Sequence, residues 1–327
     1  MSLRLIIKTY PPVVRFPGEI LIETRGLTRR FGGTIAVDSL DLKIRDGEVF
    51  GFIGPNGAGK TTTVRMLCCL IAPTAGTAFV HGLDITKPEE ALMARGKIGL
   101  LPEVPGLYET LSAYRNLDFY AQMYDVPKSV RAERIESLLK TLSMWDRRDD
   151  PVGKFSKGMK QKIAIARALV HEPDYLFLDE PTSGLDPEAS LTVRNYLLDL
   201  KKEGRTIFLN THNLDEATRL CDRVGVMKTS LLAVGTPDEL AGMFWGRTTV
   251  VRLRRAGPGM ADVVRSLPGV SGVRVEGDSL LIDVASPDDA NPLIMRELVS
   301  KGGEVLSMGE LKRGLEDVYL RLIGGRR

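Results

Sequence analysis

The feature that most constrains this 327-residue chain is a glycine-rich segment in its first quarter, Gly54-Pro55-Asn56-Gly57-Ala58-Gly59-Lys60-Thr61. It follows the apolar run 47–53, which predicts a strand, and it opens a predicted helix. Glycines at this spacing let successive backbone N–H groups face a phosphate chain, and the helix start adds its positive dipole end. The segment therefore predicts a phosphate-binding loop, and the alternative of a glycine-rich turn that binds nothing is disfavoured by this context.

Two residues of the loop carry specific chemistry. The Lys60 ammonium is expected to reach the β- and γ-phosphates of a nucleotide, and the Thr61 hydroxyl suits a magnesium ion. We expect the nucleotide-binding segment to run from Gly54 to Thr62.

A second motif is the apolar run 175–178, which ends in Asp179 and Glu180. A buried strand delivers such carboxylates to one fixed edge of a sheet, where Asp179 could hold magnesium and Glu180 could act as general base. Two acids after a strand are more often a solvated strand end. The phosphate-binding loop in the same chain favours the functional interpretation.

The order of predicted elements indicates a parallel α/β core. Strand patterns occupy 20–53, 175–178 and 206–209, with the crossover 187–202 between the last two, and a helical pattern fills about 86–150. After residue 244 the pattern changes to short strands at 248–254, 270–275 and 280–284, with helical stretches at 259–267 and 288–301. A turn at Gly277-Asp278 is expected to join the last two strands. We expect a small α+β domain over 245–327, and we assign no role to the N-terminal extension 1–18.

Composition excludes several classes of protein. The chain is 43% hydrophobic and 27% charged, and apolar runs such as 66–73 are far shorter than the ~20 residues of a membrane-spanning helix. We find no signal-peptide pattern, and three cysteines give neither a disulfide framework nor a metal spacing, so we expect a cytoplasmic protein. The net charge of +3 and the lack of a basic arm give no indication of nucleic-acid binding.

A third motif is the segment from Phe155 to Gln161, which is followed by the helical run 162–170. It lies between the phosphate-binding loop and the strand that ends in Asp179, and this order of the three motifs is diagnostic. From about residue 20 to 240 the chain resembles the ABC-transporter nucleotide-binding domain, whose signature has the form Leu-Ser-Gly-Gly-Gln. The resemblance implies a P-loop NTPase core with an antiparallel β subdomain and a helical insertion at about 105–170, within a domain spanning 19–244.

The resemblance also implies ATP as ligand, Mg²⁺ as cofactor and a set of site residues. Phe31 matches the aromatic that stacks on adenine, and its alternative is an ordinary core aromatic. Asp186 matches the loop that senses the other subunit's site, and His212 matches the switch histidine at the γ-phosphate. His81 and His171 match no functional position and are expected to be structural.

In this family two domains dimerise head to tail, so that Ser156, Lys157 and Gly158 of one copy would close over ATP bound by Lys60 of the other. The resemblance therefore implies a homodimer that works with a separate integral-membrane permease at the inner face of the cell membrane. The helical insertion near Glu103 is the expected docking site for the permease.

Four positions depart from the family pattern. Glu103 replaces a glutamine on the magnesium side, where its charge would oppose Asp179, and Lys157 replaces the first signature glycine. Phe155 and Met159 also differ from the signature. Together with the tail 315–322, these departures resemble the branch of the family that exports drugs, ions, lipids or polysaccharides. The alternative is that they are random sequence drift without functional meaning.

Two other functions stay open at this point. A stand-alone ABC ATPase acting on DNA or the ribosome is disfavoured by the single phosphate-binding loop and by the lack of heptad insertions and zinc-type cysteine pairs. A degenerate cassette that binds ATP without hydrolysis is disfavoured because Glu180 and His212 are present. The resemblance implies that the small C-terminal domain stabilises a dimer or has a regulatory role, and a passive packing domain is the alternative.

Overall fold

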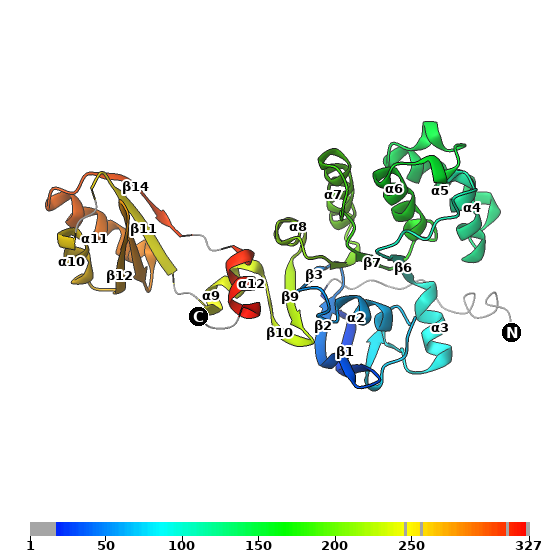
Figure 1. The fold of residues 1–327 in the computed structure, drawn as a ribbon, viewed down its shortest axis with the longest axis horizontal. Coiled ribbons are helices and arrows are strands. Elements are labelled where there is room, and N and C mark those ends of the chain that lie inside the picture. Colours follow the sequence, from blue (N-terminus) through cyan, green and yellow to red (C-terminus); the bar gives the residue numbers. More distant parts are fainter. Residues whose placement is uncertain (1–17, 245–246, 256–257, 312–313, 325–327) are drawn as a thin grey trace. The chain divides into compact units, whose positions relative to one another are not determined.

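The computed structural model describes residues 18–244, 247–255, 258–311 and 314–324. The chain divides into two compact units, one ending at Gly235 and one beginning at Thr236 (Figure 1). We expected this boundary nine residues later, at 244/245. The division falls earlier because helix α9 (Pro237–Phe244) packs against α12 (Leu315–Ile323) in the second unit. The expected extension 1–18 lies, apart from Gly18, outside the described residues.

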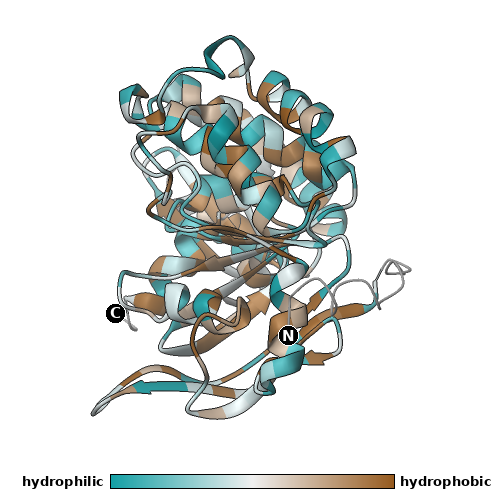
Figure 2. Cartoon of the chain, turned by 90° about the vertical axis from the view of Figure 1, so that its right-hand side faces the viewer, coloured by the Kyte–Doolittle hydropathy of each residue, from teal (hydrophilic) through white to brown (hydrophobic). Residues whose placement is uncertain are grey.

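The centre of the first unit is a six-stranded sheet in the order β10-β9-β3-β8-β7-β6. Its strands are β3 (Val49–Ile53), β6 (Ile98–Leu101), β7 (Tyr175–Asp179), β8 (Thr206–Asn210), β9 (Arg223–Lys228) and β10 (Ser230–Gly235). All neighbours are parallel except β9 and β10. Every residue of β3, β7 and β8 is buried, which explains their continuous apolar runs. In Figure 2 these strands, seen edge-on across the middle, are predominantly hydrophobic.

An antiparallel sheet in the order β2-β1-β4-β5 lies beside this core. It consists of β1 (Ile20–Phe31), β2 (Thr34–Arg45), β4 (Ala75–Val80) and β5 (Leu83–Asp84). Its apolar face shares one hydrophobic cluster with β3, with α2 (Lys60–Leu67) and with the central strands. This sheet is the antiparallel subdomain that the resemblance implied.

A helical subdomain is formed by α4 (Ala113–Met123), α5 (Lys128–Thr141) and α6 (Lys157–Leu169), with short 3₁₀ turns at Trp145–Arg147 and Val152–Lys154. Its separate core contains Leu117, Ala121, Ile135 and Leu139, which lie four residues apart on α4 and on α5 and so share one face of each helix. Helix α3 (Pro88–Gly96) precedes β6, while α7 (Pro187–Lys202) and α8 (Leu214–Leu220) flank β8.

The second unit contains a four-stranded sheet in the order β12-β13-β11-β14. Its elements are β11 (Arg247–Leu253), α10 (Pro258–Arg265), β12 (Val270–Glu276), β13 (Ser279–Val284), α11 (Pro287–Ser300) and β14 (Val305–Glu310), a β-α-β-β-α-β arrangement. The expected turn between β12 and β13 is present, with Gly277 at φ 56°. Strand β14 was not expected. None of the described helices in either unit is long and apolar enough to span a bilayer.

Candidate functional site

The phosphate-binding loop connects β3 to α2, and Lys60 is the first residue of that helix. Its side chain is buried, and its Nζ donates hydrogen bonds to the carbonyl oxygens of Gly54 (2.7 Å) and Pro55 (3.1 Å). Burial lowers the pKa of Lys60, and the charges of Glu180 and Asp179 oppose this shift. The loop thus holds the Lys60 ammonium group against two carbonyl oxygens, and the phosphate oxygens of a bound nucleotide would take the place of these carbonyl oxygens as its hydrogen-bond acceptors.

Gly59 shows why the loop needs glycine. Its φ is 95°, in the left-handed region, and a Cβ at this position would collide with the carbonyl oxygen of Ala36. The close approach of β2 therefore fixes the loop shape, and any other residue at position 59 would be strained.

Asp179 ends β7 and faces Asn210, its register partner at the end of β8. The Asn210 amide donates to the Asp179 carboxylate, and the Thr61 hydroxyl donates to the same group. Burial raises the pKa of Asp179, these two hydrogen bonds lower it, and the nearby Glu103 and Glu180 raise it further. Parallel strands that end at one edge bring these groups together.

Glu180 and His212 form a direct pair at the same edge. The Glu180 Oε1 accepts hydrogen bonds from the His212 backbone N–H (3.0 Å) and lies 2.8 Å from its Nδ1. The Glu180 side chain is 15% exposed, whereas that of His212 is 60% exposed. The arrangement places a carboxylate oriented by a histidine at the mouth of the phosphate-binding loop.

One cavity of about 590 Å³ joins these groups. Of the residues expected from the sequence it is lined by Phe31, Asn56, Gly57, Ala58, Gly59, Lys60, Thr61, Thr62, Glu103, Asp179, Glu180 and His212. Gly54 and Pro55 do not line it, although their carbonyl groups hold Lys60. Phe31 is 48% exposed rather than a core aromatic, and the guanidinium of Arg29 lies 4.6 Å above its ring.

The remaining expected residues, Ser156, Lys157, Gly158 and Asp186, lie away from this cavity. They pack together: a Cβ on Gly158 would lie 3.9 Å from the Asp186 carboxylate, and the Lys157 side chain covers Gly184. Ser156 also caps α6 by accepting from the Met159 N–H, as Asp186 caps α7 through Ala189. These residues therefore have a structural role inside their own chain.

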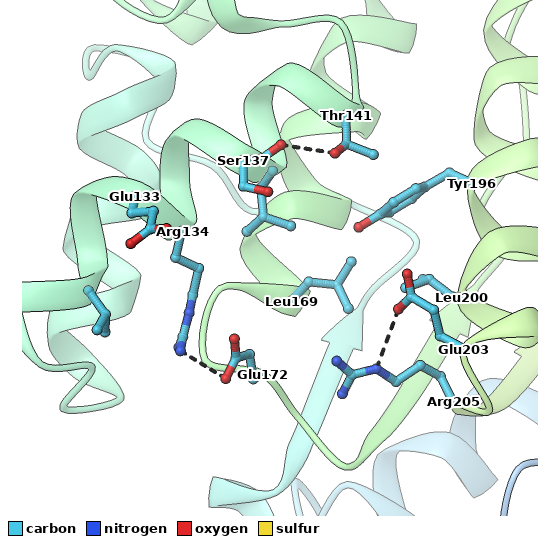
Figure 3. A pocket seen from close by; sticks show the side chains of 12 residues that line it. Glu133, Arg134, Ser137, Thr141, Leu169, Glu172, Tyr196, Leu200, Glu203 and Arg205 are labelled. Carbon is cyan, nitrogen blue, oxygen red and sulfur yellow. Dashed lines mark hydrogen bonds and ion pairs between the residues drawn. The ribbon is translucent and has the colours of Figure 1, made fainter.

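A second cavity, of about 470 Å³, opens between α5, α7 and the end of α6 (Figure 3). Its two arginines are engaged in ion pairs, Arg134 with Glu172 at 2.8 Å and Arg205 with Glu203 at 4.0 Å. None of the residues expected to bind nucleotide lines it.

Three lining residues of the main cavity, Ala36, Ser183 and Asn210, were not among the expected site residues. Asn210 could have been found from the sequence, because it ends a predicted parallel strand next to the one that ends in Asp179. Ala36 offers no such signal, since a strand from a different sheet brings it to the loop.

The fold and the site define a P-loop ATPase with a helical insertion between the loop and the acid-tipped strand β7. The family model described as ABC transporter matches residues 37–183. The chain is also 34% identical over 305 residues to the Nod factor export ATP-binding protein I of Cupriavidus metallidurans, covering 93% of this chain and 97% of that protein. The chain therefore belongs to the ABC transporter ATP-binding family.

Two further comparisons agree with this membership. The probable multidrug ABC transporter ATP-binding protein YbhF of Escherichia coli is 40% identical over 228 residues, and the match covers 68% of this chain but only 38% of YbhF. A dimeric structure of the ATP-binding cassette MJ0796 bound to ADP and Pi superposes with a TM-score of 0.60 and 25% identity, covering 66% of this chain and 98% of that one. The expected family, its exporter branch and the P-loop α/β fold are confirmed, and the chain is an ABC-type ATPase subunit.

Proposed function

We propose that this chain hydrolyses ATP and transmits the energy to a separate membrane permease of an exporter. The observation that carries this proposal is the convergence of Lys60, Asp179, Glu180 and His212 on one cavity. Lys60 and the loop amides bind the phosphates, Phe31 stacks on the adenine, and Glu180, oriented by His212, takes a proton from the attacking water.

The residues present fit a magnesium ion. Thr61, Glu103 and Asp179 face one cavity, and the carboxylates of Glu103 and Glu180 raise the pKa of Asp179, a repulsion that a divalent cation relieves. Within the described residues no cluster of His, Cys, Asp or Glu could hold a metal alone, so nucleotide phosphates would complete the coordination. When bound, the ion would neutralise charge that develops on the transferred phosphoryl group.

A head-to-tail dimer explains the separation of Ser156, Lys157, Gly158 and Asp186 from the cavity of their own chain. In such a dimer this cluster faces the ATP of the other copy, and the Lys157 ammonium adds positive charge near its phosphates. The MJ0796 cassette, whose structure is described as dimeric and bound to ADP and Pi, supports dimer formation.

A docking surface for the permease lies on the helical subdomain next to Glu103. Large apolar side chains are exposed there, with Val104 at 75%, Tyr108 at 48%, Phe119 at 38% and Met123 at 59%. Such a patch fits an amphipathic helix of a membrane partner, and we place the chain at the cytoplasmic face of the membrane. The export function in the names of the relatives favours this proposal over a stand-alone ATPase acting on DNA or the ribosome.

The test is steady-state ATP hydrolysis at increasing protein concentration, with Glu180→Gln as variant and Asp215→Asn, an exposed position on α8, as control. Turnover should need Mg²⁺, rise more than linearly with protein concentration, and fall by ~10²-fold or more in Glu180→Gln, while ATP binding persists. Equal turnover in Glu180→Gln and the control would contradict the proposal.

A further inference from the structure

Glu216 is a buried carboxyl group that the site described above does not use. It lies on α8 with 1% of its surface exposed, and among the described residues it forms no ion pair. The other two buried acids do have strong partners, Glu48 an arginine at 3.0 Å and Asp179 the amide of Asn210. A carboxyl group that is buried without an ion pair is costly, so its position calls for an explanation.

The contacts of Glu216 join two loops. Its Oε1 accepts a hydrogen bond from the Thr182 hydroxyl at 2.9 Å, and Thr182 lies between Glu180 and Asp186 in the chain. The second loop is reached through Asn213, whose Oδ1 accepts from the Glu216 backbone N–H at 3.1 Å. The hydroxyl of Thr211, the residue before His212, also acts on the Glu216 carboxyl and lowers its pKa. The Thr211 hydroxyl already accepts from the Asn213 N–H at 3.0 Å, which leaves its proton available to the Glu216 carboxyl.

The electrostatic surroundings agree with a group shared by both loops. Burial raises the pKa of Glu216, the hydroxyls of Thr211 and Thr182 oppose this shift, and Glu180 adds to it. The Oε2 atom makes no hydrogen bond of normal geometry within the described part of the chain. The charge of Arg194 also lowers the pKa of Glu216, although Glu216 forms no ion pair within the described part of the chain.

We propose that Glu216 is a positioning residue that links the Glu180–Asp186 segment to the His212 segment, so that contact of Asp186 with a second copy is transmitted to the Glu180–His212 pair. This inference rests on the function proposed above. The link is short: Thr182 is two residues from Glu180, and Thr211 is adjacent to His212, whose backbone N–H donates to Glu180. A shift of the Thr182 loop must therefore move or break its hydrogen bond to the Glu216 carboxyl. A shift of the His212 segment reaches Glu216 through Thr211 and Asn213, whose side chain accepts from the Glu216 N–H at 3.1 Å.

The experiment uses the full chain with four variants: Glu216→Ala, Glu216→Gln, Thr182→Val, and Asp215→Asn as the matched control on the exposed side of α8. ATP hydrolysis is measured against ATP and protein concentration, together with the thermal midpoint. Glu216→Ala and Thr182→Val should lower kcat between about tenfold and about 100-fold and reduce the Hill coefficient towards one, with KM for ATP little changed. Glu216→Gln retains an oxygen that accepts from Thr182 and should keep most of the activity and cooperativity.

Wild-type kcat and Hill coefficient in Glu216→Ala, with only a lower thermal midpoint, would overturn the inference and leave Glu216 a structural residue. If Glu216→Ala fails to fold, Thr182→Val decides between the same two outcomes. Absence of hydrolysis in the wild type, or full hydrolysis in Glu180→Gln, would instead refute the proposed function and the inference with it.

Discussion

Glu180 adopts a left-handed backbone conformation, with φ at 52°. A residue other than glycine pays on the order of 1–3 kcal/mol for such a conformation, so the surrounding structure must hold it in place. Its backbone N–H donates to the Asn210 carbonyl at 2.8 Å, and its carboxylate accepts from the His212 N–H. Hydrogen bonds to Asn210 and His212 thus keep Glu180 in a strained backbone conformation, which fixes the position of its carboxylate in the site.

The first prediction concerns Glu103. Replacing it by glutamine removes a negative charge that raises the pKa of Asp179, so the Asp179 pKa falls and the residue stays ionised at lower pH. Because magnesium needs the ionised carboxylate, the acidic limb of the profile of kcat/KM against pH should move to lower pH. Glu89→Gln, an exposed acid on α3, is the control and should leave the profile in place. A profile that is the same in Glu103→Gln and wild type would show that Glu103 does not act on Asp179.

The second prediction concerns Phe31. Loss of base stacking in Phe31→Ala should raise KM for ATP by about tenfold, because such stacking contributes ~1–3 kcal/mol per base. Phe31→Trp keeps an aromatic face and should stay near wild type in KM, and kcat should change little in both variants. An unchanged KM in Phe31→Ala would argue that the exposed ring, with Arg29 above it, contacts something other than adenine.

At the scale of elements, parallel strands and helix starts place the chemistry. Strands β7 and β8 end in register at Asp179 and Asn210, and α2, which follows β3, begins at Lys60. Three strands that are neighbours in the sheet, β3, β8 and β7, thus deliver their functional groups to one edge. Helices α6 and α7 begin at capping residues, Ser156 and Asp186, that the proposed dimer would also use. The same side chains thus satisfy helix termini in the monomer and face the partner in the dimer.

The third prediction concerns His171, whose side chain contacts both the C-terminal end of α4 and strand β6. Its ring stacks on Tyr124 with centroids 3.7 Å apart, and its Nε2 donates to the Ile98 carbonyl at 3.0 Å. Burial lowers the pKa of His171 from 6.5 to about 4. Since the folded state binds the proton more weakly than the unfolded chain, this contribution to stability is complete above pH 6.5 and is lost as pH falls towards 4.

Between pH 7 and pH 5 the His171 contribution to the free energy of unfolding should decrease by about 2 kcal/mol. His171→Phe keeps the stack on Tyr124 but loses the hydrogen bond to Ile98, so it should be less stable at pH 7 by about 1 kcal/mol and less sensitive to acid. Urea unfolding of both proteins at the two pH values measures this. If the wild type and His171→Phe lose the same free energy of unfolding between pH 7 and pH 5, groups other than His171 determine the acid sensitivity.

At the scale of the whole molecule, all residues of the main cavity belong to the unit that ends at Gly235. The second unit has its own hydrophobic core, which includes Val251, Ile282 and Ile294. The division into two units predicts two unfolding transitions, of which only one responds to nucleotide.

The fourth prediction follows from this division. In differential scanning calorimetry of the full Glu180→Gln chain, Mg²⁺ and ATP at about 100 times Kd should stabilise one transition by about 2.7 kcal/mol and leave the other unchanged. Calorimetry without nucleotide is the control. A single transition that moves as a whole would show that the two units unfold cooperatively.

The sequence alone determined the groups whose chemistry depends on neighbours in the chain. Gly54 to Thr61 and the pair Asp179–Glu180 could be recognised because a loop between strand and helix, or the end of a buried strand, has local requirements for glycine, lysine and acids. The alternation of strands and helices likewise predicted a parallel core that contains β7 and β8, and the turn at Gly277.

Only the tertiary structure decided what depends on contacts between distant segments. The Arg29–Phe31 stack, the cover of Gly184 by Lys157, the place of Glu216 between Thr182 and Thr211, and the assignment of α9 to the second unit have no local pattern. A buried glutamate in the first turn of a helix reads in sequence as an ordinary acid at a helix N-terminus. Packing between elements far apart in the chain determines which polar groups are buried together, and a local pattern does not contain that information.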